Sequence, residues 1–258
     1  MSHFMSYKGY LMTRSINKIR KRCDNMKNDE KLLLKQKSAQ KALSYVKNGM
    51  VLGIGSGSTV REFIRLLAAS SSLDLQSIIC IPSSFDTESL LVKANLRLGR
   101  LNQFSKIDLT IDGADRVDSK LNLIKGGGGA LLREKIVAAA SKEVIIIVDE
   151  SKLVKELAGS YPIPVEVLPL AKVFVENALQ KLGGKPSLRL AANKLGATIT
   201  DNGNMLLDTE FTKIPDIAKL EEEINNIPGV FENGLFSNRL VTRIIIATTT
   251  KGIIVKEK

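Results

Sequence analysis

Short apolar runs alternate with segments of helical periodicity through the first part of the chain. The continuous runs, typical of strands buried on both faces of a parallel sheet, occupy residues 50–54, 77–81, 107–111 and 144–148. Apolar residues spaced three and four apart predict helices over residues 31–46, 60–67, 87–94 and 130–140. Strands that alternate with helices indicate an α/β domain with a parallel sheet and right-handed crossovers.

After residue 160 the segments become shorter and turns more frequent. Strands are predicted at residues 165–168, 188–190, 197–200 and 205–208, and helices at 171–182 and 217–227. An Asp-Asn-Gly-Asn turn at 201–204 separates two of these strands. A last apolar run at 243–248 predicts a strand that returns to the edge of the first sheet. We therefore expect three parts: a basic extension over 1–28, a large domain over 29–159 and 231–258, and a smaller α+β domain over 160–230, inserted before the last strand.

Composition narrows the class of protein. Apolar residues make up 44% of the 258 residues, and no apolar run approaches the roughly 18 residues that a bilayer crossing needs, so we expect no membrane association. Cys23 and Cys80 have neither metal-ligand spacing nor a disulfide framework, which favours a reducing compartment and a cytoplasmic protein. The single histidine, His3, is near the start. Acid–base chemistry must therefore use carboxylates and lysines, and a histidine-ligated metal is nearly excluded.

The net charge of +11 is concentrated at the start of the chain. Residues 1–28 hold seven Lys and Arg but a single acid, Asp24. We interpret them as a disordered basic tail rather than a nucleic-acid-binding surface, and a mildly positive surface also suits a phosphorylated substrate. The tail is loosely similar to a mitochondrial presequence. Met26 offers an alternative start, because a helical pattern begins just after it.

A glycine- and serine-rich loop follows the first predicted strand and precedes a helix. Its sequence, Gly-Ser-Gly-Ser-Thr at 55–59, combines backbone N–H groups and hydroxyls with a helix N-terminus, an arrangement that suits a phosphate. The loop lacks the Lys-Ser/Thr of a Walker loop and the third glycine of a dinucleotide-binding loop. Taken alone, it is equally consistent with a tight turn that Ser58 caps.

Residues 107–135 carry the strongest signal for chemistry. The predicted strand at 107–111 ends in Asp-Gly-Ala-Asp, and Lys125 is followed by four consecutive glycines, 126–129, and a helix. Four glycines in a row are unfavourable for folding unless the backbone itself is needed. N–H groups that lead into a helix N-terminus can bind an anion or a developing oxyanion. We therefore interpret this stretch as an active site.

Several motifs occur together in one order. They are GSGST at 55–59, SS at 83–84, DGAD at 112–115, KGGGGAL at 125–131 with REK at 133–135, DESK at 149–152, PIPVEVLP at 162–169, DNGN at 201–204 and IPGV at 227–230. The combination resembles the ribose-5-phosphate isomerase type A family from about residue 26 to residue 258. The resemblance implies a Rossmann-like domain with a small α+β domain, in dimers or tetramers. It also implies aldose–ketose isomerisation of a small phosphosugar without a metal or organic cofactor.

The resemblance also assigns roles to residues. It implies that Glu134 is the base, and the apolar residues Ala130, Val137 and Ala138 on its helix face should desolvate the carboxylate and raise its pKa. The substrate-binding and catalytic residues that it implies are Lys125 with Gly126, Gly127 and Gly128 for the enediolate, Asp112, Gly113, Ala114 and Asp115 for the sugar, and Ser56, Gly57, Ser58, Thr59, Lys152 and Lys35 for the phosphate. The chain departs from the family pattern at Arg116 and Leu132, neither of which carries the chemistry.

Two other classes of function remain. A non-catalytic sugar-phosphate-sensing domain of a regulator could use a similar fold, but the 28-residue tail is too short for a helix-turn-helix. An acyl-CoA-utilising transferase on a related fold would need a covalent carboxylate and a longer chain. Convergence of Glu134 and Lys125 on one pocket with the loop at 55–59 distinguishes the isomerase from both.

Overall fold

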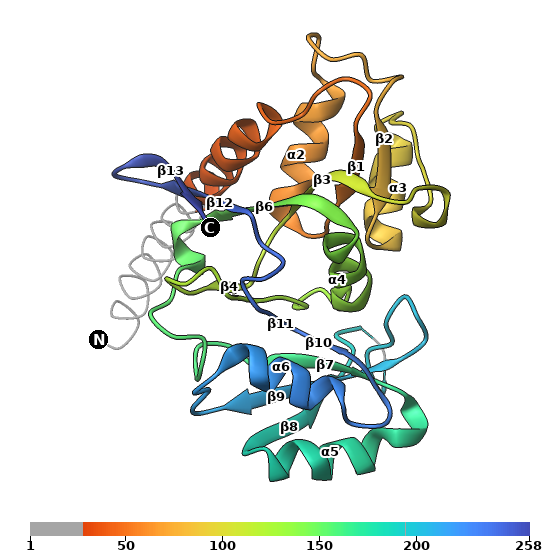
Figure 1. The fold of residues 1–258 in the computed structure, drawn as a ribbon, viewed down its shortest axis with the longest axis vertical. Coiled ribbons are helices and arrows are strands. Elements are labelled where there is room, and N and C mark those ends of the chain that lie inside the picture. Colours follow the sequence, from red (N-terminus) through yellow and green to blue (C-terminus); the bar gives the residue numbers. More distant parts are fainter. Residues whose placement is uncertain (1–27, 194) are drawn as a thin grey trace, which may run out of the picture.

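The computed structural model describes residues 28–193 and 195–258, and its larger part is built on a six-stranded sheet (Figure 1). The strands, in order across the sheet, are β13 (Gly252–Glu257), β12 (Arg243–Thr248), β6 (Ser141–Asp149), β3 (Ile107–Asp112), β1 (Val51–Ile54) and β2 (Ile79–Pro82). Neighbours are parallel except for β13, which is antiparallel to β12. The predicted α/β class with a mostly parallel sheet is confirmed.

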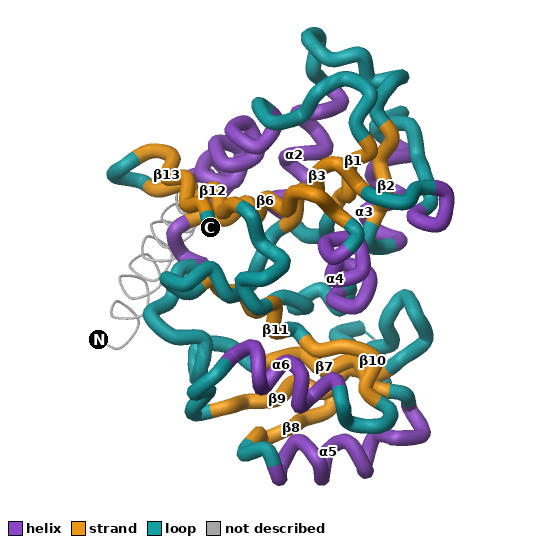
Figure 2. The backbone as a smooth tube through the Cα atoms, viewed as in Figure 1, coloured by secondary structure: helices purple, strands orange, loops and turns teal. Residues whose placement is uncertain are grey.

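Both faces of this sheet are buried, because its strands are apolar at successive positions. On one face, Ile145 and Ile147 of β6 pack with α2 (Ser58–Ala68), with Leu91 of α3 (Phe85–Lys93) and with the helix that includes residues 28–43. On the other face, Ile146 and Val148 pack with Ala138 of α4 (Leu131–Ala139). Helices therefore cover both sides of the sheet (Figure 2).

The returning strand is not the edge of the sheet, so that prediction is wrong. β12 lies between β6 and β13, and β13 is the edge strand. A tight turn, in which the Lys251 N–H donates to Thr248 Oγ1 over 2.9 Å, leads into β13. The three apolar side chains of β13 are only half-buried and are followed by exposed charged residues. The pattern therefore contained too short an apolar run to indicate a strand.

The second part contains a four-stranded antiparallel sheet with two helices. Its strands, in order, are β10 (Val230–Asn233), β7 (Ile163–Val167), β9 (Met205–Phe211) and β8 (Gly184–Leu188), and its helices are α5 (Lys172–Lys181) and α6 (Ile217–Asn225). Val175 and Leu179 of α5 and Leu220 and Ile224 of α6 fill one core against β7 and β9. The predicted helices at 171–182 and 217–227 are confirmed. The division of the chain into 29–159 with 231–258 and 160–230 stays a prediction, and this sheet extends to Asn233.

Two of the short strands predicted here differ from the structure. The strand placed at 188–190 occurs earlier, as β8, and includes Pro186, which an edge strand tolerates because it needs no N–H on its open side. Residues 197–200 form no strand and make only isolated bridges, Leu190 with Ala197 and Ile199 with Met205. Ile199 is 46% exposed. Local β propensity does not produce a strand where the fold provides no partner along its length.

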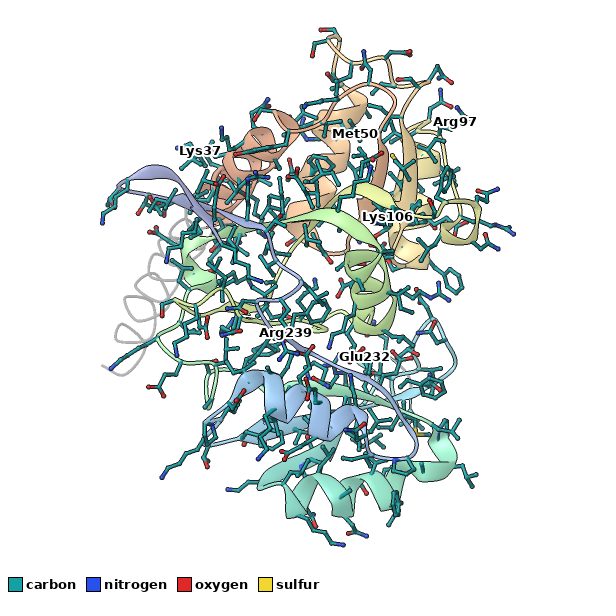
Figure 3. The ribbon with its side chains drawn as sticks, in the orientation of Figure 1. Lys37, Met50, Arg97, Lys106, Glu232 and Arg239 are labelled. Carbon is teal, nitrogen blue, oxygen red and sulfur yellow. The ribbon has the colours of Figure 1, made fainter. Side chains whose placement is uncertain are left out.

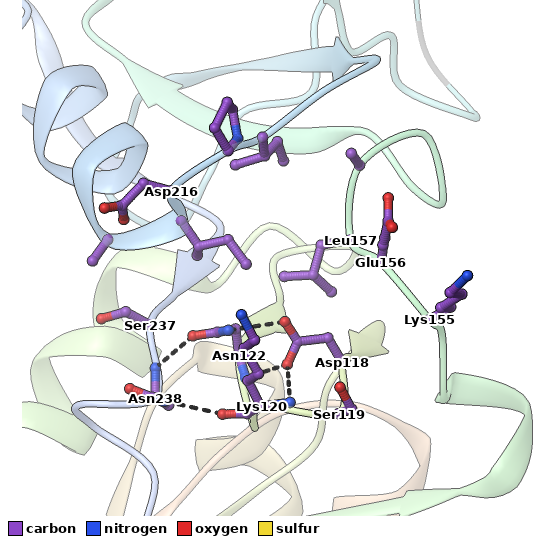
Figure 4. Close-up of a pocket in the computed structure, with 15 residues that line it drawn as sticks. Asp118, Ser119, Lys120, Asn122, Lys155, Glu156, Leu157, Asp216, Ser237 and Asn238 are labelled. Carbon is purple, nitrogen blue, oxygen red and sulfur yellow. Dashed lines mark hydrogen bonds between the residues drawn. The ribbon is translucent and has the colours of Figure 1, made fainter.

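A small three-stranded sheet lies between the two larger sheets. It consists of β11 (Leu235–Phe236), β5 (Leu123–Ile124) and β4 (Arg116–Val117). The turn between β4 and β5 is fixed by Asp118, which accepts hydrogen bonds from the Lys120 N–H and from the N–H and side-chain amide of Asn122 (Figure 4). Asn238 donates to Asn122 and to the Lys120 carbonyl. This turn therefore fixes the approach of β5, which leads directly into Lys125.

A second buried cluster connects α4 with the smaller sheet. The Lys135 ammonium lies 2.8 Å from carboxylate oxygens of both Glu221 and Glu232, and it donates to the carbonyls of Asn233 and Leu235. Glu232 is labelled in Figure 3, close to α6. These four charged or polar partners satisfy the buried ammonium only if both parts of the chain are in place. The helix that carries Glu134 is thus attached to both.

Three one-turn 3₁₀ segments complete the described elements, at Leu101–Gln103, Glu150–Lys152 and Pro169–Ala171. Within residues 28–193 and 195–258, none of the helices has the length and apolar character that a bilayer crossing requires.

Candidate active site

The loop between β1 and α2 lies against the end of β3. The Ser56 N–H donates to Asp112 Oδ1 over 3.1 Å, and the Gly55 N–H donates to the Ile111 carbonyl over 2.9 Å. A Cβ at position 55 would lie 1.9 Å from Asp112 Oδ1, so only glycine fits there. Gly57 has φ +101° and precedes α2, whose first turn contains no acidic side chain. The positive end of this helix is therefore available to an anion.

Lys125 places a buried ammonium at the centre of the site. Its Nζ lies 2.9 Å from Asp112 Oδ2 and 3.2 Å from Glu134 Oε2, and it donates to the Gly113 carbonyl over 2.7 Å. Only 3% of the side chain is exposed. The backbone is fixed as well, because the Lys125 N–H donates to the Gly234 carbonyl over 2.9 Å. The ammonium is thus held rigidly between two carboxylates.

The glycines after Lys125 form a tight turn into α4. Gly126 and Gly129 have φ +96° and +82°, a region that favours glycine, and the Gly129 N–H donates to the Gly126 carbonyl over 3.0 Å. The Gly127 N–H donates to Asp115 Oδ2 over 2.7 Å. A Cβ at Gly128 would meet nothing within 4 Å, and the residue lines the cavity described below. The glycine run therefore orients Asp115 and presents bare backbone.

Glu134, in the first turn of α4, is the acid whose pKa is most strongly changed. It is 5% exposed, as its apolar helix neighbours predicted. Burial first, and then the Asp112 carboxylate, raise the pKa of Glu134 to about 8, although Lys125 acts in the opposite direction. Oε2 faces the Lys125 ammonium but has no aligned hydrogen bond within the described part of the chain. A carboxylate with such a pKa can accept and return a proton near neutral pH.

The pKa of Lys125 moves in the direction that keeps it charged. Burial acts to lower this pKa, but the carboxylates of Asp112 and Glu134 outweigh burial and raise it above its ordinary value. Lys125 is therefore a permanent cation at physiological pH. It can stabilise negative charge, but it cannot act as a base.

Thirteen of the predicted site residues line one cavity of about 120 Å³. They are Ser56, Gly57, Ser58, Thr59, Gly113, Ala114, Asp115, Lys125, Gly126, Gly127, Gly128, Glu134 and Lys152. Asp112 lies behind the wall, 2% exposed, where it holds Lys125 and the Ser56 N–H. Lys35, on the helix over 28–43, is not among the lining residues. The cavity thus joins the loop at 55–59, the Asp-Gly-Ala-Asp turn and the glycine run.

Three other hollows are larger than this cavity, at about 500, 720 and 250 Å³. The first lies beside the turn at 118–122 (Figure 4), where the side chains of Lys155 and Glu156 are exposed. The second is a largely apolar groove beside Phe85 and Ile136. The third lies beside Tyr45 and Arg243. None of the three contains a buried ion pair, so the smaller cavity is the better candidate despite its size.

Sequence reasoning missed one residue that touches the glycine run. Arg189, just after β8, donates from Nη1 to the carbonyls of Gly126 and Gly127 over 2.9 and 3.2 Å. The tripeptide Leu-Arg-Leu that contains it has no local feature to distinguish it from an ordinary strand end. Only the tertiary structure brings residue 189 to residue 126.

Comparisons with known proteins point to one family. Residues 79–251 match the family described as ribose 5-phosphate isomerase A (phosphoriboisomerase A). The chain is 47% identical over 214 residues to the ribose-5-phosphate isomerase A of Thermosynechococcus vestitus, covering 83% of this chain and 91% of that protein. Its identity to the Methanocaldococcus jannaschii protein of the same name is 44% over 221 residues, covering 85% and 96%.

Solved structures show the same fold. The ribose 5-phosphate isomerase A of Methanocaldococcus jannaschii superposes with a TM-score of 0.81 at 43% identity, covering 87% of this chain and 98% of that one. The ribose 5-phosphate isomerase of Plasmodium falciparum gives 0.82 at 36%, covering 88% and 99%. A D-ribose-5-phosphate isomerase in complex with phospho-erythronic acid gives 0.84 at 38%, covering 87% and 98%. This chain therefore belongs to the ribose 5-phosphate isomerase A family.

Proposed function

We propose that the chain interconverts D-ribose 5-phosphate and D-ribulose 5-phosphate through an enediolate, with Glu134 as the base. One observation carries the proposal: a buried carboxylate with a raised pKa lies 3.2 Å from a buried ammonium, in a cavity that also contains the loop at 55–59. The alternative of a non-catalytic sugar-phosphate sensor is not favoured, because the relatives at 44–47% identity are named as isomerases.

In this mechanism Glu134 moves one proton between two carbons. The carboxylate removes the C2 proton of the open-chain aldose, and the carbonyl at C1 becomes the negative oxygen of an enediolate. Lys125 and the backbone of Gly128 stabilise that oxygen. Glu134 then returns its proton to C1 while the O2 proton moves to O1, which leaves the ketone at C2. Atoms and charge balance without any further reactant.

The two aspartates have different roles in this proposal. Asp115 lines the cavity and is oriented by the Gly127 N–H, so it contacts sugar hydroxyls and assists ring opening. Asp112 is enclosed and paired with Lys125, so it positions the ammonium and does not touch the substrate. The earlier expectation that both face the sugar is thereby narrowed to Asp115.

Phosphate binding is assigned to the loop at 55–59 together with Lys152. Ser58 and Thr59 begin α2, where N–H groups and hydroxyls meet the positive end of the helix. Lys152 reaches the same cavity from the 3₁₀ turn after β6. Lys35 contributes nothing to the cavity as described, and its phosphate role has no support in the geometry.

Separate replacement of Ser58 and Lys152 by alanine should mainly raise KM. Phosphate contacts are largely the same in the ground state and the transition state, so their loss weakens both equally. Steady-state kinetics of each variant with ribose 5-phosphate will measure this. A fall in kcat with unchanged KM in both variants would contradict the phosphate assignment.

The reaction itself should be measured as conversion of ribose 5-phosphate in the presence of EDTA, across a range of pH. We expect full activity in the chelator, since the proposed steps use only side chains and backbone. The base must be deprotonated, so kcat/KM should rise with pH and level off above the Glu134 pKa of about 8. Activity that disappears in EDTA and returns with a divalent metal would refute the proposed chemistry.

We also propose that the protein is a cytoplasmic homodimer or homotetramer. Support for assembly comes from exposed large apolar side chains on the smaller part, Leu168, Leu170, Val173, Phe174 and Phe231. Support for a reducing compartment comes from Cys80, which is a buried free thiol.

A further inference from the structure

Arg189 is held in a fixed orientation by one carboxylate. Its Nε donates to Asp208 Oδ2 over 2.8 Å, and its Nη2 donates to Asp208 Oδ1, which makes the pair bidentate. Such pairing fixes the plane of the guanidinium and is stronger than a hydrogen bond between neutral groups. The remaining Nη1 points at the glycine run, where it donates to the carbonyls of Gly126 and Gly127.

These two carbonyls determine where the next two N–H groups point. In a trans peptide the C=O and the following N–H lie in one plane and point in opposite directions, and no cis peptide occurs in the described residues. The Gly126 carbonyl shares its plane with the Gly127 N–H, which donates to Asp115. The Gly127 carbonyl shares its plane with the N–H of Gly128, a cavity-lining residue. Arg189 therefore binds the carbonyls of two peptide groups, and the N–H groups of the same two peptides belong to the cavity-lining residues Gly127 and Gly128.

The charge of Arg189 adds a second effect. A cationic donor polarises the peptide groups whose carbonyls it binds, and a polarised peptide is a better donor through its N–H. Arg189, from outside the cavity, would thus both orient the Gly127 and Gly128 N–H groups and make them stronger hydrogen-bond donors. Arg189 itself is not among the residues that line it.

We propose that Arg189, fixed by Asp208, is a positioning residue that aims the Gly127 and Gly128 N–H groups at Asp115 and at the oxygen of the enediolate. The inference rests on the proposed isomerase function. It gives the smaller part of the chain a role in catalysis, since Arg189 directly follows β8 and Asp208 is in β9. If Arg189 only connected the two parts of the chain, its contacts would not need to be with the carbonyls of Gly126 and Gly127.

The test is Arg189→Gln, with Arg239→Gln as the matched control. Arg239 is also an arginine paired with a carboxylate, Glu222, but it is exposed and does not line the cavity (Figure 3). Because misplacing a catalytic group by about 1 Å can lower the rate about 10²-fold, we expect Arg189→Gln to lower kcat by about 10- to 100-fold. KM should change less than about threefold, since the phosphate contacts remain. Arg239→Gln should match the wild type.

Inhibitor binding separates positioning from general damage. Phospho-erythronic acid, which a solved relative binds, carries a carboxylate that can occupy the place of the enediolate oxygens, whereas inorganic phosphate probes only the loop at 55–59. Arg189→Gln should weaken inhibition by phospho-erythronic acid by about the same factor as kcat. Inhibition by inorganic phosphate should not change.

Unchanged kcat in Arg189→Gln, or equal weakening of both inhibitors, would overturn the proposal. If Arg189→Gln does not fold, Asp208→Asn takes its place, because the amide retains the shape and one hydrogen bond of the carboxylate. It should show a smaller loss of kcat with the same selectivity between the inhibitors, and an unchanged kcat would count against the inference. Inactive wild type and inactive Arg239→Gln would instead contradict the proposed function.

Discussion

Replacement of Glu134 by glutamine should lower kcat by about 10²- to 10⁴-fold, the usual effect of losing a general base and equivalent to roughly 3–5 kcal/mol of barrier. The amide has the size of the carboxylate but cannot accept the C2 proton. No histidine lines the cavity to replace it. Glu134→Asp should be intermediate, because the base is present but about one methylene too far from the carbon. Turnover of ribose 5-phosphate gives the first measurement.

Exchange of the C2 proton with deuterated solvent gives the second measurement, independent of product formation. If Glu134→Gln still exchanged that proton at the wild-type rate, Glu134 would have no part in the mechanism. The base would then be Asp115, the other carboxylate that lines the cavity.

Thermal unfolding of Glu134→Gln against pH shows whether the fold is intact and checks the pKa. The folded-state pKa of Glu134, about 8, lies above the ordinary value of 4.5. The wild type therefore loses stability as pH rises between these values. The Glu134 carboxylate is then ionised in the unfolded chain, where water hydrates it, whereas in the folded protein the charge would be buried. Glutamine removes this loss. The melting temperature of the variant relative to the wild type should rise over the same interval of pH.

Replacement of Lys125 by methionine should affect activity and stability together. Methionine approximates the length of lysine but leaves the carboxylates of Asp112 and Glu134 without their cation. Loss of an oxyanion-stabilising donor lowers kcat by about 10²- to 10³-fold, and breaking a buried ion pair lowers the free energy of unfolding by about 3–5 kcal/mol. The pKa of Glu134 should rise further, because Lys125 normally lowers it. The pH profile of kcat/KM should therefore shift upward.

Lys135→Met is the matched control for that variant. Lys135 is equally a buried lysine between two carboxylates, Glu221 and Glu232, but it does not line the cavity. We expect a comparable loss of stability by denaturant unfolding, with kcat of the folded protein within several-fold of the wild type. If both variants lost the same fraction of kcat, the effect of Lys125 would be structural rather than electrostatic.

The sequence alone predicts an element correctly where the burial of that element is visible in its own pattern of apolar residues. The β6 run Val144 to Val148 is apolar at every position because both faces of the strand are covered, and that pattern needs no partner to be recognised. The face of α2 formed by Val60, Phe63, Ile64 and Leu67 was equally direct. The cavity followed from glycines and charges at strand ends, since parallel strands bring their carboxyl ends to one edge.

The sequence did not predict features that depend on contacts between residues far apart in the chain. β13 has a short apolar run and becomes a strand only because β12 offers its edge, whereas residues 197–200 have the propensity of a strand but no such partner. Arg189 is oriented by Asp208 on the neighbouring strand β9 and contacts glycines that are far away in the chain. Lys35 does not line the cavity, and its phosphate role, assigned from an alignment of few residues, stays a prediction. Pattern alone cannot supply such contacts.

The hydrogen bond from the Lys125 N–H to the Gly234 carbonyl has a consequence for how the chain reaches its active state. Gly234 also donates to the Pro164 carbonyl over 2.7 Å, and a Cβ at Gly234 would lie 2.3 Å from the Lys125 carbonyl oxygen. Three segments, separated by tens of residues to roughly a hundred residues, thus meet behind the ammonium. Closing loops of that length is entropically slow, so the junction should form late in folding. Recovered enzymatic turnover during refolding would then report the completed fold, while compact intermediates with most of their helices would remain catalytically silent.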